Sequence, residues 1–125
     1  MPHVVLEGAL TLADVVRRHE PFLAREGDRL VKTERLYVDT EGRAALLETL
    51  VVDRGHTQKF FIQIQARAGG ITVRLEPLTD PEKSPGVKRA LGIVALRIRQ
   101  ATGCRLGSTN IPEHLVDQKP PEGPR

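Results

Sequence analysis

Hydrophobic positions along the chain change their spacing several times, and each spacing predicts a different element. Residues 3–10 are mostly apolar, which is typical of a strand inside a sheet. Over residues 12–23 apolar side chains recur every three or four positions, which predicts one face of a helix. Thr11 can cap this helix, Pro21 should kink it, and Gly27 should end it.

Beyond Gly27 the pattern becomes that of strands in series. Residues 30–39 are rich in strand-forming side chains. Residues 43–53 should form the next strand, although their first half also has high helix propensity, so a helix stays open as the alternative. Residues 59–67 and 71–77 alternate between apolar and polar on either side of a Gly-Gly pair, which predicts a β-hairpin. Its inward side chains should be Phe60, Ile62, Ile64, Val73 and Leu75.

The last third of the chain contains a second helical pattern. Apolar residues at helical spacing over 87–101 predict an amphipathic helix that ends at Gly103. Residues 104–110 should be irregular or a short strand, and residues 111–116 should form one helical turn. The final stretch, 117–125, is polar and rich in proline, and we expect a flexible tail there.

These elements follow one another in the order strand, helix, four strands, helix, in a chain whose length suits one domain. We therefore expect a single α+β domain over residues 1–116, in which an antiparallel sheet of about five strands carries two helices on one face. The core should be aliphatic, because the chain has three Phe, one Tyr and no Trp. Burial of these aliphatic side chains between sheet and helices should be the main source of stability.

Composition narrows the class of protein without identifying it. A net charge of +3 and a pI of about 9.4 permit an acidic partner but do not require one. The single cysteine, Cys104, excludes an internal disulfide and favours a reducing compartment. With neither a leader pattern nor a long apolar stretch, we expect a cytoplasmic protein that makes no membrane contact. The four histidines are not at metal-ligand spacing, so neither a metal nor a cofactor is expected.

The first seven residues, Met-Pro-His-Val-Val-Leu-Glu, resemble the opening of the tautomerase superfamily, in particular the carboxymethyl-hydroxymuconate isomerases. A looser likeness extends to Asp-Arg-Gly-His at 53–56 and the strand that follows. The resemblance implies a catalytic N-terminal proline that acts as general base, aided by arginines, in a trimer. That residue is Pro2, whose amine is free only if Met1 is removed. Pro2 equally suits the first position of a strand, so this structural role stays open beside the catalytic one.

Basic residues form a second group of candidates. They mark the second helix and the outer face of the hairpin, at Lys88, Arg89, Arg97 and Arg99 and at Arg67 and Arg74. Arg67 and Arg74 should lie near each other across the hairpin. A basic helix and a basic sheet face could bind nucleic acid, although few aromatic residues are present to stack on bases. The element order is also similar to that of TATA-box-binding-protein-like folds, a likeness of layout from which no residue role is carried over.

Self-assembly is the third possibility. Phe61 is a large apolar side chain on the otherwise polar face of its strand, and such a face often packs against a second copy of the same chain. We therefore expect a non-enzymatic binding or assembly module that is homo-oligomeric, with an unidentified ligand. A nucleic-acid-binding domain and a Pro2-dependent isomerase are the alternatives.

Overall fold

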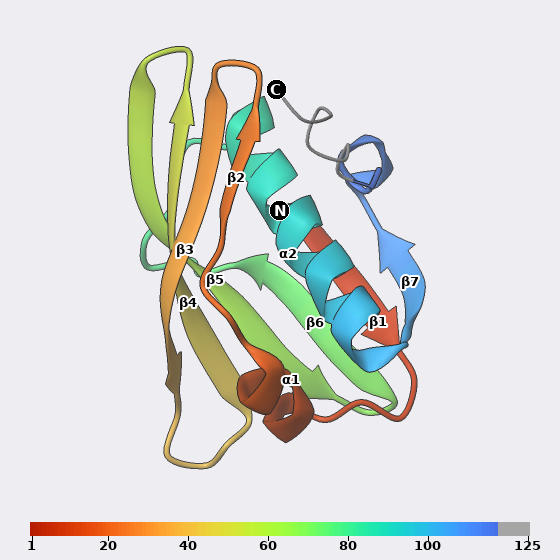
Figure 1. The fold of residues 1–125 in the computed structure, drawn as a ribbon. Helices are drawn as coiled ribbons and strands as arrows, with labels where there is room; N and C mark the ends of the chain where they lie inside the picture. The colour runs from red at the N-terminus through yellow and green to blue at the C-terminus, as the bar shows by residue number, and fades with distance from the viewer. Residues whose placement is uncertain (118–125) are drawn as a thin grey trace.

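The computed structural model describes residues 1–117 and confirms the α+β class, with two α-helices packed on a curled antiparallel sheet (Figure 1). The strands are β1 (His3–Glu7), β2 (Leu23–Glu26), β3 (Arg29–Val38), β4 (Ala44–Asp53), β5 (His56–Arg67), β6 (Gly70–Leu75) and β7 (Arg105–Thr109). The helices are α1 (Leu12–Arg18), α2 (Pro85–Thr102) and the 3-10 turn η1 (Pro112–His114). The flexible tail predicted over residues 117–125 lies, apart from Asp117, outside the described residues.

The strands form one sheet in the order β2-β3-β4-β5-β6-β1-β7, and all neighbouring pairs are antiparallel. β2 to β6 follow one another as a meander, and β1 lies between β6 and β7. The sheet curls around α2, which contacts β1, β3, β4 and β6 (Figure 1). α1 packs beside α2 and against β5, so both helices occupy the concave face, as the sequence predicts.

Seven strands are present rather than about five, and the two additional ones, β2 and β7, form the sheet edges. β2 replaces the second half of the helix predicted over residues 12–23, and that prediction is wrong beyond Arg18. Pro21 has no N–H to donate and disfavours a helical conformation for the residue before it, so the helix ends at His19 in extended backbone. Gly27 does not end a helix; it supplies a φ of 64° in the tight turn to β3.

The segment with two possible readings, residues 43–53, is strand β4. It pairs with β3 along one edge and with β5 along the other. Alternate side chains point into the core and are buried, namely Ala45, Leu47, Thr49 and Val51. Backbone pairing on both edges, together with burial of one face, outweighs the helix propensity of this segment.

The predicted hairpin is confirmed as β5 and β6. Ile64 lies opposite Val73, and Ile62 lies opposite Leu75. These four side chains and that of Phe60, all predicted to point inward, are each at most 4% exposed. The hairpin therefore supplies the centre of the core on which the helices pack.

The central turns of α2 are buried. Ser84 caps its start by accepting a hydrogen bond from the Val87 amide, and Gly103 ends it with a φ of 72°. The sheet covers one side of the helix and η1 covers another, so Leu91 and Ile93 are both fully buried. In the part of the chain that the structure describes, no helix is long and apolar enough to cross a membrane.

Arg89 was predicted on the surface, but it is buried, with 5% of its area exposed. Its Nε and Nη2 donate to the two carboxylate oxygens of Glu26 on β2, at 2.9 and 2.7 Å. Its Nη1 donates to the backbone carbonyls of His114 and Val116, at 2.9 and 2.8 Å. A buried charge has to be paired, and Glu26 together with the two carbonyls meets this requirement. Through these bonds Arg89 joins α2, β2 and the C-terminal segment.

His114 makes stability depend on pH. Burial lowers the pKa of His114 below 6.5, the positive charges of Lys88, Arg29 and Arg89 lower it further, and Glu113 opposes the shift. As the pH falls below about 6.5, the unfolded chain takes up a proton that the folded chain resists, so stability should fall. We expect a lower thermal midpoint at pH 5.5 than at pH 7.5, and a smaller difference in His114→Gln. An unchanged pH dependence in that variant would contradict this role.

Candidate functional site

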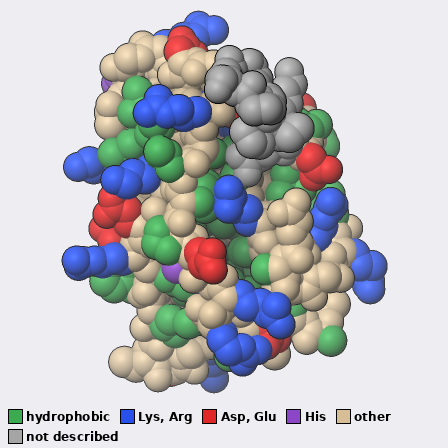
Figure 2. Space-filling model, in the orientation of Figure 1, with side chains coloured by type: hydrophobic (Ala, Val, Ile, Leu, Met, Phe, Trp, Pro, Cys, Tyr) green, Lys and Arg blue, Asp and Glu red, His purple; other side chains and the backbone are tan. Residues whose placement is uncertain are grey.

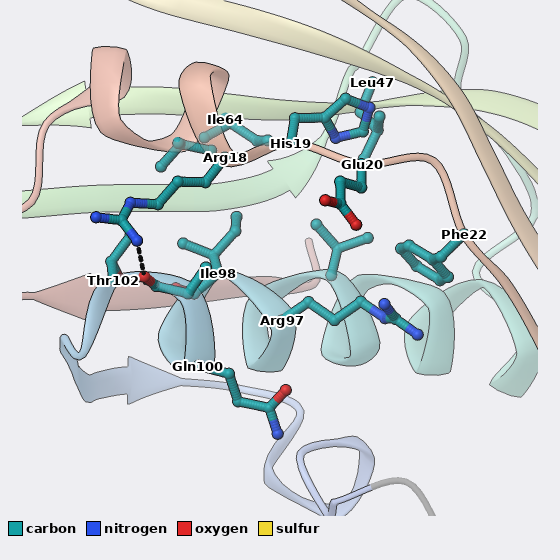
Figure 3. Close-up of a pocket in the computed structure, with 13 residues that line it drawn as sticks. Arg18, His19, Glu20, Phe22, Leu47, Ile64, Arg97, Ile98, Gln100 and Thr102 are labelled. Atoms are coloured by element: carbon teal, nitrogen blue, oxygen red, sulfur yellow. Dashed lines mark hydrogen bonds between the residues drawn. The ribbon is translucent and has the colours of Figure 1, made fainter. Parts of the chain in front are cut away.

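A cavity of about 380 Å³ opens on the concave face, between α1, α2 and the sheet (Figure 3). Three parts of the chain build it: the end of α1 with the segment that leads to β2, the C-terminal half of α2, and the middle of β4 and β5. The lining residues are Val15, Arg18, His19, Glu20, Phe22, Leu47, Ile64, Val94, Arg97, Ile98, Gln100, Ala101 and Thr102.

The floor of the cavity is apolar. Leu47 and Ile64 reach it from the sheet, Val15 from α1, and Val94 and Ile98 from α2. All five belong to the hydrophobic core and are less than 10% exposed. A ligand on this floor would therefore extend the core outward and remove apolar surface from water.

Charged side chains surround the floor. Arg18 ends α1, and its Nη1 donates to the Ala101 carbonyl of α2 at 3.0 Å. The guanidinium of Arg97 lies over the ring of Phe22, with 4.1 Å between its central carbon and the ring centroid. Glu20 extends from the segment after α1 toward α2, on the side of the cavity where Phe22 and Arg97 lie (Figure 3). The rim therefore offers both signs of charge above an apolar surface.

The short helix α1 places these rim groups. Thr11 and Asp14 form a capping box, in which each side chain accepts a hydrogen bond from the other residue's backbone amide. The bonds from Thr11 hold the pKa of Asp14 below its usual value, and Arg17 adds to the effect. The helix then ends at His19, and the extended backbone there directs Glu20 toward α2. Pro21 thus produces the turn that completes the cavity wall.

His19 lines the cavity, but its ring is turned toward β3. Its Nε2 donates to the carbonyl oxygen of Glu34 at 3.0 Å. This bond occupies one ring nitrogen and ties the segment after α1 to the sheet. The imidazole therefore acts as a structural tether, and the rim groups that face a ligand are the charged ones.

A second feature lies on the opposite, convex face of the sheet, which neither α1 nor α2 covers. There, apolar side chains of β3, β4 and β5 alternate outward, and we call Tyr37, Leu46, Leu50, Val52 and Phe61 the outer patch. The rings of Tyr37 and Phe61 meet edge to face, 6.2 Å apart. Tyr37 keeps 47% of its area exposed. An apolar patch of this kind on a monomer's surface is typical of an interface.

The candidate catalytic proline lies away from the cavity. Pro2 is buried immediately before β1 and does not line the cavity. The residues on either side of it are held by Asn110, which donates to the Met1 carbonyl at 2.8 Å and accepts from the His3 amide at 2.9 Å. This is the leading position of a strand, the structural role that the sequence left open. The isomerase hypothesis stays a prediction. The arginines that line the cavity, Arg18 and Arg97, do not support it, because Pro2 lies outside the cavity.

The predicted basic residues do not gather into one surface. Arg67 lies opposite Gly70 and Arg74 opposite Gln63, so the prediction that the two arginines are neighbours is wrong. Gly70 and Arg74 are four positions apart along β6, about 13 Å of strand. Arg74 instead donates to the Gln63 side chain.

The helix and sheet portions of the predicted basic surface lie on opposite sides of the sheet. Arg74 points to the convex face, whereas α2 packs on the concave face. On α2, Lys88 and Arg99 are half-buried, and Arg99 lies 3.9 Å from Asp117. Figure 2 shows Lys and Arg side chains scattered among Asp and Glu on the concave side. Nucleic-acid binding stays a prediction, without a continuous surface to support it.

The cavity itself was not expected from the sequence. Arg97 is a candidate because it is basic, whereas Arg18, Glu20 and Phe22 belong to the predicted helix that Pro21 should kink and are not among the candidates. The signal in the sequence is Pro21: it interrupts the apolar pattern directly after Arg18 and Glu20, and charged residues beside such a break can line a cavity. No group of three or more His, Cys, Asp or Glu side chains among residues 1–117 is arranged to hold a metal ion.

Comparisons with known proteins add no relative: no family model, curated protein or solved structure matches this chain. The function has to be argued from the geometry of the cavity and of the outer patch.

Proposed function

We propose that this chain is a non-enzymatic binding module whose ligand is a small amphipathic molecule held in the cavity between α1, α2 and the sheet. The observation that carries the proposal is the combination of an apolar floor with a charged rim in one concave site. Ligand sites in proteins usually have this character, with few polar groups that orient a largely apolar contact.

The size of the cavity supports a small ligand. Its volume of about 380 Å³ lies at the lower end of the range for ligand pockets, roughly 300–1,000 Å³. A nucleotide or a long lipid would extend well beyond the lining residues. Three separate chain segments meet at the site, so ligand binding should also stabilise the fold, because the ligand binds only the folded state.

The test blocks the mouth of the cavity. Ala101 is exposed at the rim, and in Ala101→Trp the indole should cover the floor. Ala13→Trp is the matched control, because Ala13 is exposed on α1 but does not line the cavity. Titration with indole, a neutral amphipathic probe, should give saturable amide shifts at lining residues such as Val94. These shifts should vanish in Ala101→Trp and persist in Ala13→Trp; shifts that are equal in both variants would refute the proposal.

The outer patch supports a second candidate, assembly with a second copy of this chain. Beside Leu50 and Phe61 of the outer patch lie Lys59 and Glu48, and also Lys32 and Glu34, which pair with each other at 2.9 Å. An isologous contact brings the same surface of each copy together, so Lys59 of one copy can face Glu48 of the other. Apolar side chains between these charges would then be buried in a dimer.

Replacement of Tyr37 tests this assembly. Light scattering at high protein concentration should give a dimer for the native chain and a monomer for Tyr37→Lys, because the substitution removes an exposed aromatic ring from the apolar contact and puts a charge in its place. Leu78→Lys is the control, since Leu78 is 93% exposed and lies outside the outer patch. A monomeric native chain, or a Tyr37→Lys variant that still dimerises, would exclude the outer patch as the interface.

A further inference from the structure

We infer that the ligand of the cavity is a free α-amino acid with an apolar side chain, bound as a zwitterion. The inference rests on the proposed function and adds the chemical class of the ligand. It follows from three features of the cavity: opposite charges at one end, the Arg18 side chain bonded to α2 at the opposite end, and an apolar floor between them.

The first feature is the presence of Glu20 and Arg97, which carry opposite charges, in one cavity lining. The two residues lie at the end of the cavity that Phe22 borders (Figure 3). The Phe22 ring occupies one face of the Arg97 guanidinium, which leaves its N–H groups, directed along the plane, to donate. Neither residue forms an ion pair with the other among the described residues. An ammonium and a carboxylate on one carbon atom can bridge them, the ammonium to Glu20 and the carboxylate to Arg97.

The second feature is the opposite end of the cavity, where Arg18 lies (Figure 3). Its guanidinium is held by the Ala101 carbonyl, so its methylene stem covers the gap between α1 and α2. A ligand side chain that enters from the Glu20 end therefore meets hydrocarbon at this end.

The third feature is the floor between the two ends. Val94 and Ile98 lie one helical turn apart on α2, with Leu47 and Ile64 of the sheet beside them. A branched aliphatic or aromatic side chain fits such a surface and would bury its area there. Glycine carries the same two charges but would gain nothing from this floor.

The mixed charge also explains what the site should reject. A fatty acid or another simple anion would leave the Glu20 carboxylate without a partner, and a simple amine would leave the Arg97 guanidinium without one. Only a ligand with both charges satisfies both residues, and a hydrogen bond to a charged group contributes about 1.5–3 kcal/mol, or about tenfold or more in affinity.

The experiment compares four ligands by calorimetry. L-Leucine has both charges and the isobutyl chain; 4-methylpentanoate lacks the ammonium, 3-methylbutylamine lacks the carboxylate, and glycine lacks the chain. We expect L-leucine to bind at least about tenfold more tightly than each of the other three. Equal affinity for L-leucine and 4-methylpentanoate, or no binding of L-leucine, would overturn the inference.

Two variants test which residue binds the ammonium of the ligand and which binds its carboxylate. Glu20→Gln should lose affinity for L-leucine and gain affinity for 4-methylpentanoate relative to the native chain. Arg97→Met keeps an apolar stem against Phe22 and should show the reverse preference, for 3-methylbutylamine. Unchanged preferences in both variants would overturn the inference. In that case the indole titration separates the two proposals. If indole still shifts the lining amides of the native chain, and Ala101→Trp abolishes these shifts, the cavity binds ligands and only the proposed ligand class is wrong.

Discussion

Arg89→Met should lower the free energy of unfolding by about 3–5 kcal/mol, the cost of breaking a buried charged pair by removing one partner. The substitution withdraws the bidentate guanidinium from Glu26 and leaves the carbonyls of His114 and Val116 without that donor. Methionine is close to arginine in length and can fill the apolar part of the space, so the substitution leaves little empty volume. The decrease in the free energy of unfolding therefore measures mainly the lost charge and hydrogen bonds. Denaturation in urea, followed by circular dichroism, measures the change.

A double variant separates the pair from its surroundings. Arg89→Met combined with Glu26→Leu should be less destabilised than the sum of the two single variants, because neither charge is then left buried without the other. Arg105→Ala is the matched control: Arg105 has a side chain that is 75% exposed and lies 3.9 Å from Glu7. Its loss should change stability by less than about 1 kcal/mol. If Arg89→Met lowers the free energy of unfolding as little as Arg105→Ala does, the bonds of Arg89 to β2 and to the C-terminal segment do not stabilise the fold.

Gly92→Ala should destabilise the protein by about 1–3 kcal/mol, although alanine normally favours a helix interior by about 1 kcal/mol over glycine. A methyl group at Gly92 would overlap the carbonyl oxygen of His114, which is a backbone atom and cannot rotate away. η1 would have to move off α2, and the carbonyls that Arg89 holds would move with it. The sign of the effect therefore distinguishes close packing from helix propensity.

Hydrogen exchange locates the effect of this substitution. In Gly92→Ala the Leu115 amide, which donates to the Pro112 carbonyl in η1, should exchange faster than in the native chain. Gln100→Ala, at an exposed position of the same helix, serves as the control and should change stability by no more than about 0.5 kcal/mol. A Gly92→Ala variant that is as stable as the native chain would mean that η1 does not pack on α2 as closely as the structure indicates.

The sequence alone determined the elements whose patterns are local. The hairpin of β5 and β6 follows from strict alternation around Gly69 and Gly70, because alternation turns one face of a strand to the core. α2 follows from the helical spacing of apolar residues up to Gly103, which accepts a left-handed conformation. These signals depend on neighbours a few residues away, so no tertiary information is needed to interpret them.

Only the tertiary structure decided the features that join distant segments. Pro21 ends helix α1 locally, but the pairing of β2 with β3 sets the course of the segment that follows, and that pairing places Glu20 in the cavity wall. Arg89 is buried because Glu26 and the C-terminal segment come to it from positions far away in the chain. A spacing pattern records which residues share a face, whereas a cavity or a buried ion pair depends on which faces meet, and that is decided when the sheet curls around α2.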